Sequence, residues 1–172
     1  MPTYTPISSI LLTSSASSVT LSGIPQDYQD LVLVMTLSNV GTTLVAGDAK
    51  ITLNSDTSST MSHTSLAATY NNGTATSSVT TTAHGSTGSF YLTYDFHIPG
   101  TVAGVSQWKI NLQNYSNTSM NKQLLIRANS ANVEVKSDTM LWNNTAAITS
   151  IKIDAITRSE EHTSELQSHS FI

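Results

Sequence analysis

The sequence has no cysteine and few charged residues, and both absences limit what the chain can be. Without cysteine, neither disulfides nor thiolate metal sites can contribute. Only 10% of the 172 residues are charged, and the scattered Lys residues give no basic stripe for nucleic acid. No apolar run approaches the ~20 residues of a membrane-spanning helix. The N-terminus lacks the basic start of a signal peptide, so we expect a soluble protein made in a cytoplasm.

Serine, threonine and asparagine take the place of the missing charges. Threonine suits a pleated surface, while serine and asparagine compete with helix hydrogen bonding and favour turns. Helical periodicity is not convincing anywhere, whereas roughly ten short alternating segments recur at strand-and-turn spacing. The sequence therefore predicts an all-β fold, an antiparallel β-sandwich with a jelly-roll-like topology, in one domain over residues 1–157.

One stretch, Asp30–Ser38, is apolar on both faces of an extended strand, because Leu31 and Leu33 alternate with Val32 and Val34. This pattern predicts a central strand covered on both sides. The other expected strands are largely one-faced, and they are Tyr4–Thr13, Val19–Ser22, Lys50–Asn54, Phe90–Ile98, Gln107–Gln113, Leu124–Ala128, Val133–Val135, Met140–Trp142 and Ile151–Ala155.

The segment from Ser55 to His84 consists almost entirely of small polar residues. Its one firm signal is Asn72-Gly73, a pair typical of a tight hairpin turn. We interpret the segment as a hairpin with a weakly specified register, since few large side chains fix its buried face. A low-complexity linker is the alternative.

No catalytic or metal-binding motif stands out. The three body histidines, His63, His84 and His97, lie far apart without metal-ligand spacing. The chain has no G-x-S-x-G elbow, no phosphate-binding glycine motif and no carboxylate pair that could be nominated. We therefore expect no enzyme, no cofactor and no metal site, although loop serines and acids leave an enzyme as the least favoured alternative.

Four loop acids could in principle approach a calcium ion, but the D-x-[DN]-x-[DN]-G spacing is absent. Solvated loop carboxylates are the favoured interpretation of these residues, which are Asp27, Asp30, Asp48 and Asp56.

Three tyrosines fall at outward strand phases or in turns: Tyr70, Tyr91 and Tyr115. Exposed tyrosine rings can stack on sugars, but tyrosine also packs well on strands. They are the candidate glycan-stacking residues of a carbohydrate-binding module.

The last fifteen residues differ from the rest in composition. Three of the four Glu lie here, and with Arg158 they carry a net charge of −2, half of the chain's −4. The run R-S-E-E-H-T-S-E-L-Q-S, residues 158–168, resembles the in-frame translation of a common sequencing-library adapter. We therefore expect 158–172 to be a non-native, disordered tail and exclude it from the fold. A natural disordered terminus is the alternative.

The segment Pro6–Val34, which contains S-S-I-L-L-T-S-S-A-S-S-V-T-L-S-G-I-P-Q-D-Y-Q-D, resembles the opening of a family of small tailed-phage proteins found in environmental viral sequences. Asn111–Ser119 and Leu141–Ile151 are similar to later parts of that family. The resemblance implies a virion structural or tail-fibre-like protein with no catalytic residues to carry over. Family members continue past the position of Thr157 to a further strand, so the resemblance implies that the 1–157 domain is truncated at its last strand.

Two functions follow as expectations. The first is a non-enzymatic virion protein, a capsid decoration or a tail or fibre component. It would be a homo-oligomer that contacts other virion proteins and a host-surface glycan, without membrane insertion, and would be located in a virion assembled in the host cytoplasm. The alternative is a carbohydrate-binding β-sandwich module.

Overall fold

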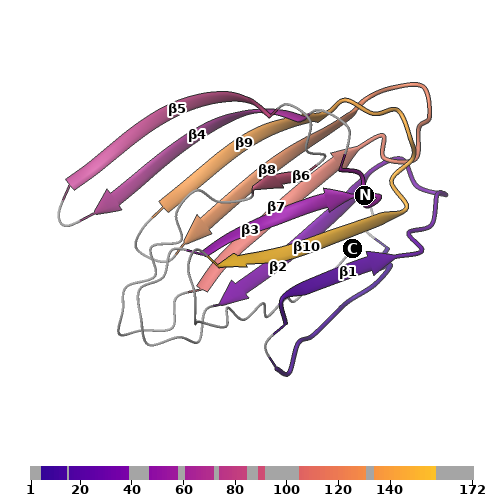
Figure 1. Cartoon of the computed structure of the whole chain (residues 1–172), viewed down its shortest axis with the longest axis horizontal. Coiled ribbons are helices and arrows are strands. Elements are labelled where there is room, and N and C mark those ends of the chain that lie inside the picture. Colours follow the sequence, from indigo (N-terminus) through magenta and orange to yellow (C-terminus); the bar gives the residue numbers. More distant parts are fainter. Residues whose placement is uncertain are drawn as a thin grey trace.

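A computed structural model describes residues 5–14, 16–38, 47–57, 61–71, 74–84, 89–91, 105–130 and 134–157. Every regular element in these ranges is a β-strand, and none of them is a helix (Figure 1). No helix that could cross a membrane therefore occurs in the described part of the chain. The adapter-like residues 158–172 lie outside the described residues.

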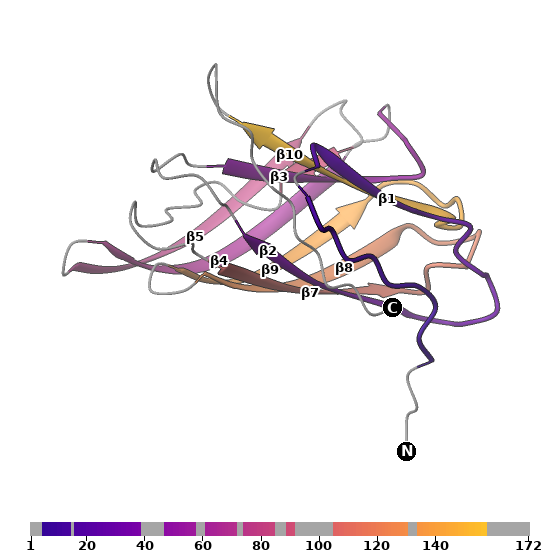
Figure 2. The ribbon, with the colours of Figure 1, turned by 90° about the horizontal axis from the view of Figure 1, so that it is seen from below.

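Within the described residues, ten strands form two antiparallel sheets that pack face to face as a β-sandwich (Figure 2). The strands are β1 (Ser18–Ser22), β2 (Leu31–Ser38), β3 (Gly47–Leu53), β4 (Met61–Asn71), β5 (Thr74–His84), β6 (Ser89–Tyr91), β7 (Val105–Gln113), β8 (Lys122–Ser130), β9 (Glu134–Trp142) and β10 (Ser150–Thr157). One sheet has the order β1-β10-β3-β6 and the other β2-β7-β8-β9-β4-β5.

The core lies between the two sheets and is built from every second residue of the strands. In the six-stranded sheet, register aligns these inward positions in rows, such as Leu33, Ile110 and Ile126. The facing sheet contributes Ile51 and Ile151, both fully buried. The alternation of apolar and polar residues along the strands therefore gives each sheet one apolar face, as expected for a sandwich.

The six-stranded sheet is wider than the sheet that covers it, and β4 and β5 form its overhanging side (Figure 1). The side chains of 74–79 in β5 are exposed on both faces of the strand. On the outward face, Leu66 and Val79 lie opposite each other, 54% and 71% exposed. The β4–β5 hairpin thus confirms the predicted hairpin and rules out the linker, with its turn outside the described residues.

The prediction for Asp30–Ser38 is half right. The segment is a strand, but β2 lies at an edge of its sheet rather than at the centre. Leu31, Leu33 and Met35 are buried, whereas Val32 and Val34 on the other face are only half-buried. The apolar residues on both faces of β2 therefore reflect partial burial of its second face, and they do not indicate a central position in the sheet.

Two further predictions are wrong in detail. Residues 5–12 form no strand, although Ile7, Ile10 and Leu12 pack against the core from an irregular segment. Val135 and the segment Met140–Trp142, predicted in separate strands, belong to one strand, β9, and Val135 points outward, 63% exposed. Val133 lies outside the described residues. The large side chains of Met140 and Trp142 fix the phase of β9, which places its charged residues on the inner face.

The other strand predictions are confirmed where the structure describes them. β1, β3, β7, β8 and β10 cover the expected segments, with Trp108 and Ile153 buried as predicted. Of the expected strand Phe90–Ile98, only β6 falls within the described residues.

Candidate functional site

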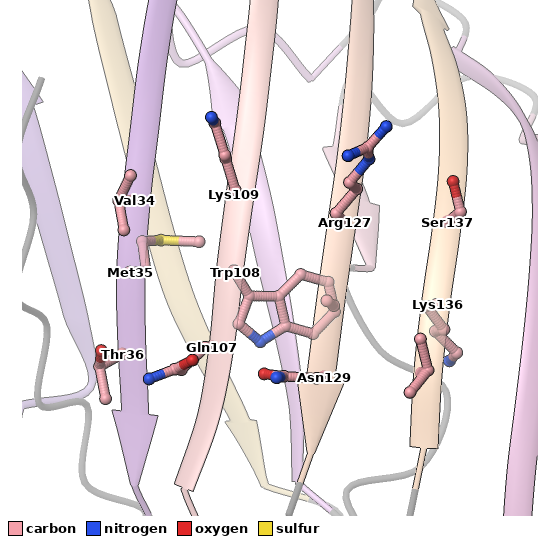
Figure 3. Close-up of a pocket in the computed structure, with 12 residues that line it drawn as sticks. Val34, Met35, Thr36, Gln107, Trp108, Lys109, Arg127, Asn129, Lys136 and Ser137 are labelled. Carbon is pink, nitrogen blue, oxygen red and sulfur yellow. The ribbon is translucent and has the colours of Figure 1, made fainter.

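A groove of about 480 Å³ crosses the outward face of the six-stranded sheet (Figure 3). It runs across four neighbouring strands, β2, β7, β8 and β9, because its lining residues are register partners of one another. One wall consists of Val34, Lys109, Arg127 and Ser137, and the other of Thr36, Gln107, Asn129 and Val135. The floor is the strand segment between the two rows, at Met35, Trp108, Ala128 and Lys136.

Local sequence explains the groove. Side chains that alternate along a strand leave a gap between positions i and i+2 on one face, and aligned register extends this gap from strand to strand. Long polar side chains on β7 and β8 raise the walls, and Figure 3 shows Lys109 and Arg127 side by side in one of them. Its size falls in the ligand-pocket range of roughly 300–1,000 Å³.

Lys109 and Arg127 are direct cross-strand partners, and both are exposed. None of the outward positions in the described strands of this sheet is an acid. Elsewhere, Lys136 pairs with Glu134 at 3.1 Å and Lys152 with Asp154 at 2.6 Å. The groove therefore holds two adjacent positive charges without an acidic neighbour on its face, in a chain whose net charge is −4.

A second polar cluster lies at one end of the sandwich, where four loops meet. Three segments that are distant in sequence come together here: Pro6–Val34, Asn111–Ser119 and Leu141–Ile151. Tyr115 is fully buried, its hydroxyl donates to the carbonyl of Pro25, and its own carbonyl accepts from the Ile148 amide at 2.8 Å. Gln26 Nε2 donates to the same Ile148 residue's carbonyl at 3.0 Å. These three segments thus build one interlocked end of the fold.

Lys122 anchors this end. Its side chain is fully buried, and Nζ donates to the carbonyls of Asn117, Met120 and Thr145 at 2.5, 2.7 and 3.0 Å. Burial lowers the pKa of this amine. All three protons of the ammonium are used, so it holds two loops together and has no proton donor left for a ligand.

Asn54 ties β3 to the start of β10. Its backbone φ is 52°, and its Oδ1 accepts from the amides of Thr149 and Ser150 at 2.8 and 3.1 Å. Its Nδ2 donates to the Ala147 carbonyl at 2.7 Å. Asparagine tolerates this left-handed conformation better than most residues, and its amide satisfies three backbone groups at once.

Two of the loop acids considered for calcium are bonded to protein groups instead. Asp30 accepts from the Asn114 amide at 2.8 Å. Asp56 Oδ2 accepts from Trp142 Nε1 and Asn144 Nδ2 at 3.1 and 3.0 Å. No cluster of three or more His, Asp or Glu residues suited to a metal occurs among the described residues.

The interior face of β4 and β9 carries a polar group that sequence reasoning missed. His63 and Asp138 are buried, and Ser65 lies opposite Asp138 in register and hydrogen-bonds to its carboxylate. Burial raises the pKa of Asp138, against the lowering effects of Ser65, Lys136 and His63. The two-residue spacing of His63 and Ser65 was visible in the sequence, but only the register brings Asp138 to them.

The three predicted glycan-stacking tyrosines do not form an exposed platform that the structure describes. Tyr115 is buried, so its prediction as an outward aromatic is wrong: its ring fills the core and its hydroxyl is satisfied by the backbone. Tyr70 and Tyr91 lie in β4 and β6, and their side chains, like that of His84 and the whole of His97, fall outside what the structure describes.

Comparison of the chain with protein-family models, with curated proteins and with solved structures found no match.

Proposed function

We propose that this chain is a non-enzymatic structural protein of a phage particle, a capsid decoration or a tail or fibre component. In this proposal it acts by assembling with further copies of itself and with other virion proteins. Three resemblance segments support the proposal, because they are distant in sequence yet meet at the interlocked loop end around Tyr115.

The strand order gives further support. If the β8–β9 hairpin is set aside, the two sheets have the orders β1-β10-β3-β6 and β2-β7-β4-β5. This order resembles that of a jelly roll, with eight strands in two four-stranded sheets, and so supports the jelly-roll-like topology that we propose. Jelly rolls are used by viral capsid and lectin domains.

The observation that carries the proposal is the overhanging β4–β5 edge. β5 pairs with β4 on one side, spans eleven residues, and has exposed side chains on both faces over 74–79. A long uncharged edge strand is a template for pairing with another chain. The exposed Leu66–Val79 pair adds apolar surface next to that edge. A second copy pairing its own β5 edge would continue the sheet and cover this surface.

Multi-angle light scattering of the full chain tests the assembly. We expect an oligomer at about 100 µM for the wild type, a concentration at which a complex with a micromolar dissociation constant is largely formed. Val79→Lys places a charge in the edge and should yield monomer. Met120→Lys, which changes an exposed apolar residue at the opposite loop end, is the matched control and should keep the oligomer. A monomeric wild type, or equal loss in both variants, would contradict assembly through this edge.

A further inference from the structure

We propose that the transverse groove across β2, β7, β8 and β9 binds an acidic saccharide, with Lys109 and Arg127 contacting its carboxylate or sulfate groups. This site is separate from the β4–β5 edge and does not depend on the proposed assembly. It is also distinct from the tyrosines considered for sugar stacking.

Charge placement is the first argument. Like charges directly opposite each other on neighbouring strands destabilise a sheet. Among the other described basic residues, Lys122 is bound by carbonyls, Lys136 and Lys152 have acidic partners, and Lys50 faces Asp154 in register. Lys109 and Arg127 alone form a basic pair on a face whose described outward positions include no acid. A bound anion between them would relieve this repulsion with charge-assisted hydrogen bonds.

The opposite wall gives the second argument, because it provides polar groups suited to hydroxyls. Gln107 and Asn129 are cross-strand partners that face the basic pair across the groove. Each side-chain amide both donates and accepts hydrogen bonds. Thr36 adds a hydroxyl to the same wall, and Ser137 adds one to the wall of the basic pair. A row of neutral donors and acceptors opposite two cations matches a ligand with several hydroxyls and one or two negative groups per unit.

Nucleic acid fits less well. Single strands are bound by stacking bases on exposed aromatic rings along an extended basic track. The one aromatic residue in the groove, Trp108, is buried and contributes to the floor. The walls of the groove carry only two cations, on two adjacent strands, because the third basic residue of the lining, Lys136, is paired with Glu134. The groove crosses the strands and does not run along one, so an extended peptide lying in it would not pair with the β2 edge by strand addition.

Isothermal titration with the full chain tests the proposal, using a sulfated heparin hexasaccharide and an oligogalacturonate as probes. Neutral dextran, a dT20 oligonucleotide and a poly-Glu peptide serve as comparison ligands. We expect binding of at least one acidic saccharide, weakened on going from 50 to 300 mM NaCl because the contacts are ionic. Lys109→Gln combined with Arg127→Gln should lower that affinity at least tenfold, whereas Lys152→Gln, which removes one charge from the other sheet, should leave it within twofold.

A second variant separates sugar recognition from general attraction to anions. Asn129→Ala should weaken saccharide binding about threefold or more, while any residual binding of dT20 or poly-Glu stays unchanged. The proposal is overturned if neither saccharide binds at millimolar concentration, if dT20 or poly-Glu binds more tightly than both saccharides, or if Lys152→Gln weakens binding as much as the groove variants. Loss of folding in the double variant would be detected by circular dichroism, and the single variants Lys109→Gln and Arg127→Gln then decide.

Discussion

Lys109 on β7 and Arg127 on β8 lie directly opposite each other on the outward face of the six-stranded sheet. Both side chains are exposed, and each forms part of the same groove wall. Two like charges in this arrangement destabilise the sheet locally. A single substitution would remove the repulsion, so selection for stability alone does not explain the pair. Its presence is therefore the feature of this surface that most needs a functional explanation.

Removing one charge should stabilise the free protein. Arg127→Gln is expected to raise the free energy of unfolding by about 0.5 kcal/mol, because it ends a like-charge contact. Urea unfolding in 20 mM salt measures the change, and the gain should fade in 0.5 M NaCl, where the charges are screened. A destabilised variant at low salt would mean that Arg127 makes a favourable contact which the repulsion argument overlooks.

Lys122→Met should be strongly destabilising. Methionine approximates the length of the lysine stem but leaves the carbonyls of Asn117, Met120 and Thr145 without their donor. We expect the free energy of unfolding to fall by about 3 kcal/mol, because each buried unsatisfied carbonyl costs roughly 1–3 kcal/mol. Removal of the buried positive charge offsets part of this cost. Gln123→Met at the neighbouring exposed position of β8 is the control and should change stability by less than about 0.5 kcal/mol. Similar unfolding midpoints for the two variants would refute the anchoring role.

Two substitutions at Asn54 separate its backbone role from its side-chain role. Asn54→Gly keeps access to the positive φ but loses the bonds to Ala147, Thr149 and Ser150, at an expected cost of about 2 kcal/mol. Asn54→Ala loses the same bonds and also strains the backbone, for about 1 kcal/mol more. Chemical denaturation of both variants measures the order. Equal stability of the two would show that the backbone conformation contributes little.

Asp138 should make stability depend on pH in the direction opposite to that of most acids. Burial raises its pKa in the folded protein, so the native state binds a proton more tightly than the unfolded state does. The contribution of Asp138 to the free energy of unfolding is therefore most favourable at low pH. It is lost as the pH rises from the pKa of an unfolded Asp, near 3.9, through the raised pKa of the folded state. Asp138→Asn should remove this loss and stabilise the protein at pH 7 by about 1 kcal/mol.

Chemical unfolding of the wild type and of Asp138→Asn between about pH 3 and pH 8 measures whether this contribution falls as the pH rises. The range spans the ordinary carboxyl pKa. Asp154→Asn, which changes an acid of the surface pair with Lys152, is the matched control. If the advantage of Asp138→Asn were constant over the whole range, titration of Asp138 would not be its source.

The alternation of Trp108, Ile110 and Leu112 was enough to predict β7 and its buried face, because period 2 is a local property. The fold class followed from such segments. The edge position of β2 did not, since pairing partners are not encoded in the strand itself. Likewise the predicted strand Val133–Val135 did not show that Glu134 points inward together with Lys136 and Asp138, because Met140 and Trp142 set the phase of β9.

The site was less accessible to sequence reasoning than the fold. The groove depends on register across four strands, which aligns Lys109 with Arg127 and Gln107 with Asn129. No short motif contains these residues together. For Tyr115 the prediction was wrong because a turn position suggested an exposed ring. The converging loops enclose the ring, and its hydroxyl donates to the Pro25 carbonyl.

If this chain is a component of a virus particle, as we propose, it should be present in purified particles. Mass spectrometry of gradient-purified particles, from a host that carries the gene, measures this. We expect to recover body peptides such as the tryptic product Ile110–Lys122, in amounts comparable with those of other structural proteins. Recovery of these peptides from the infected-cell lysate but not from the purified particles would contradict it.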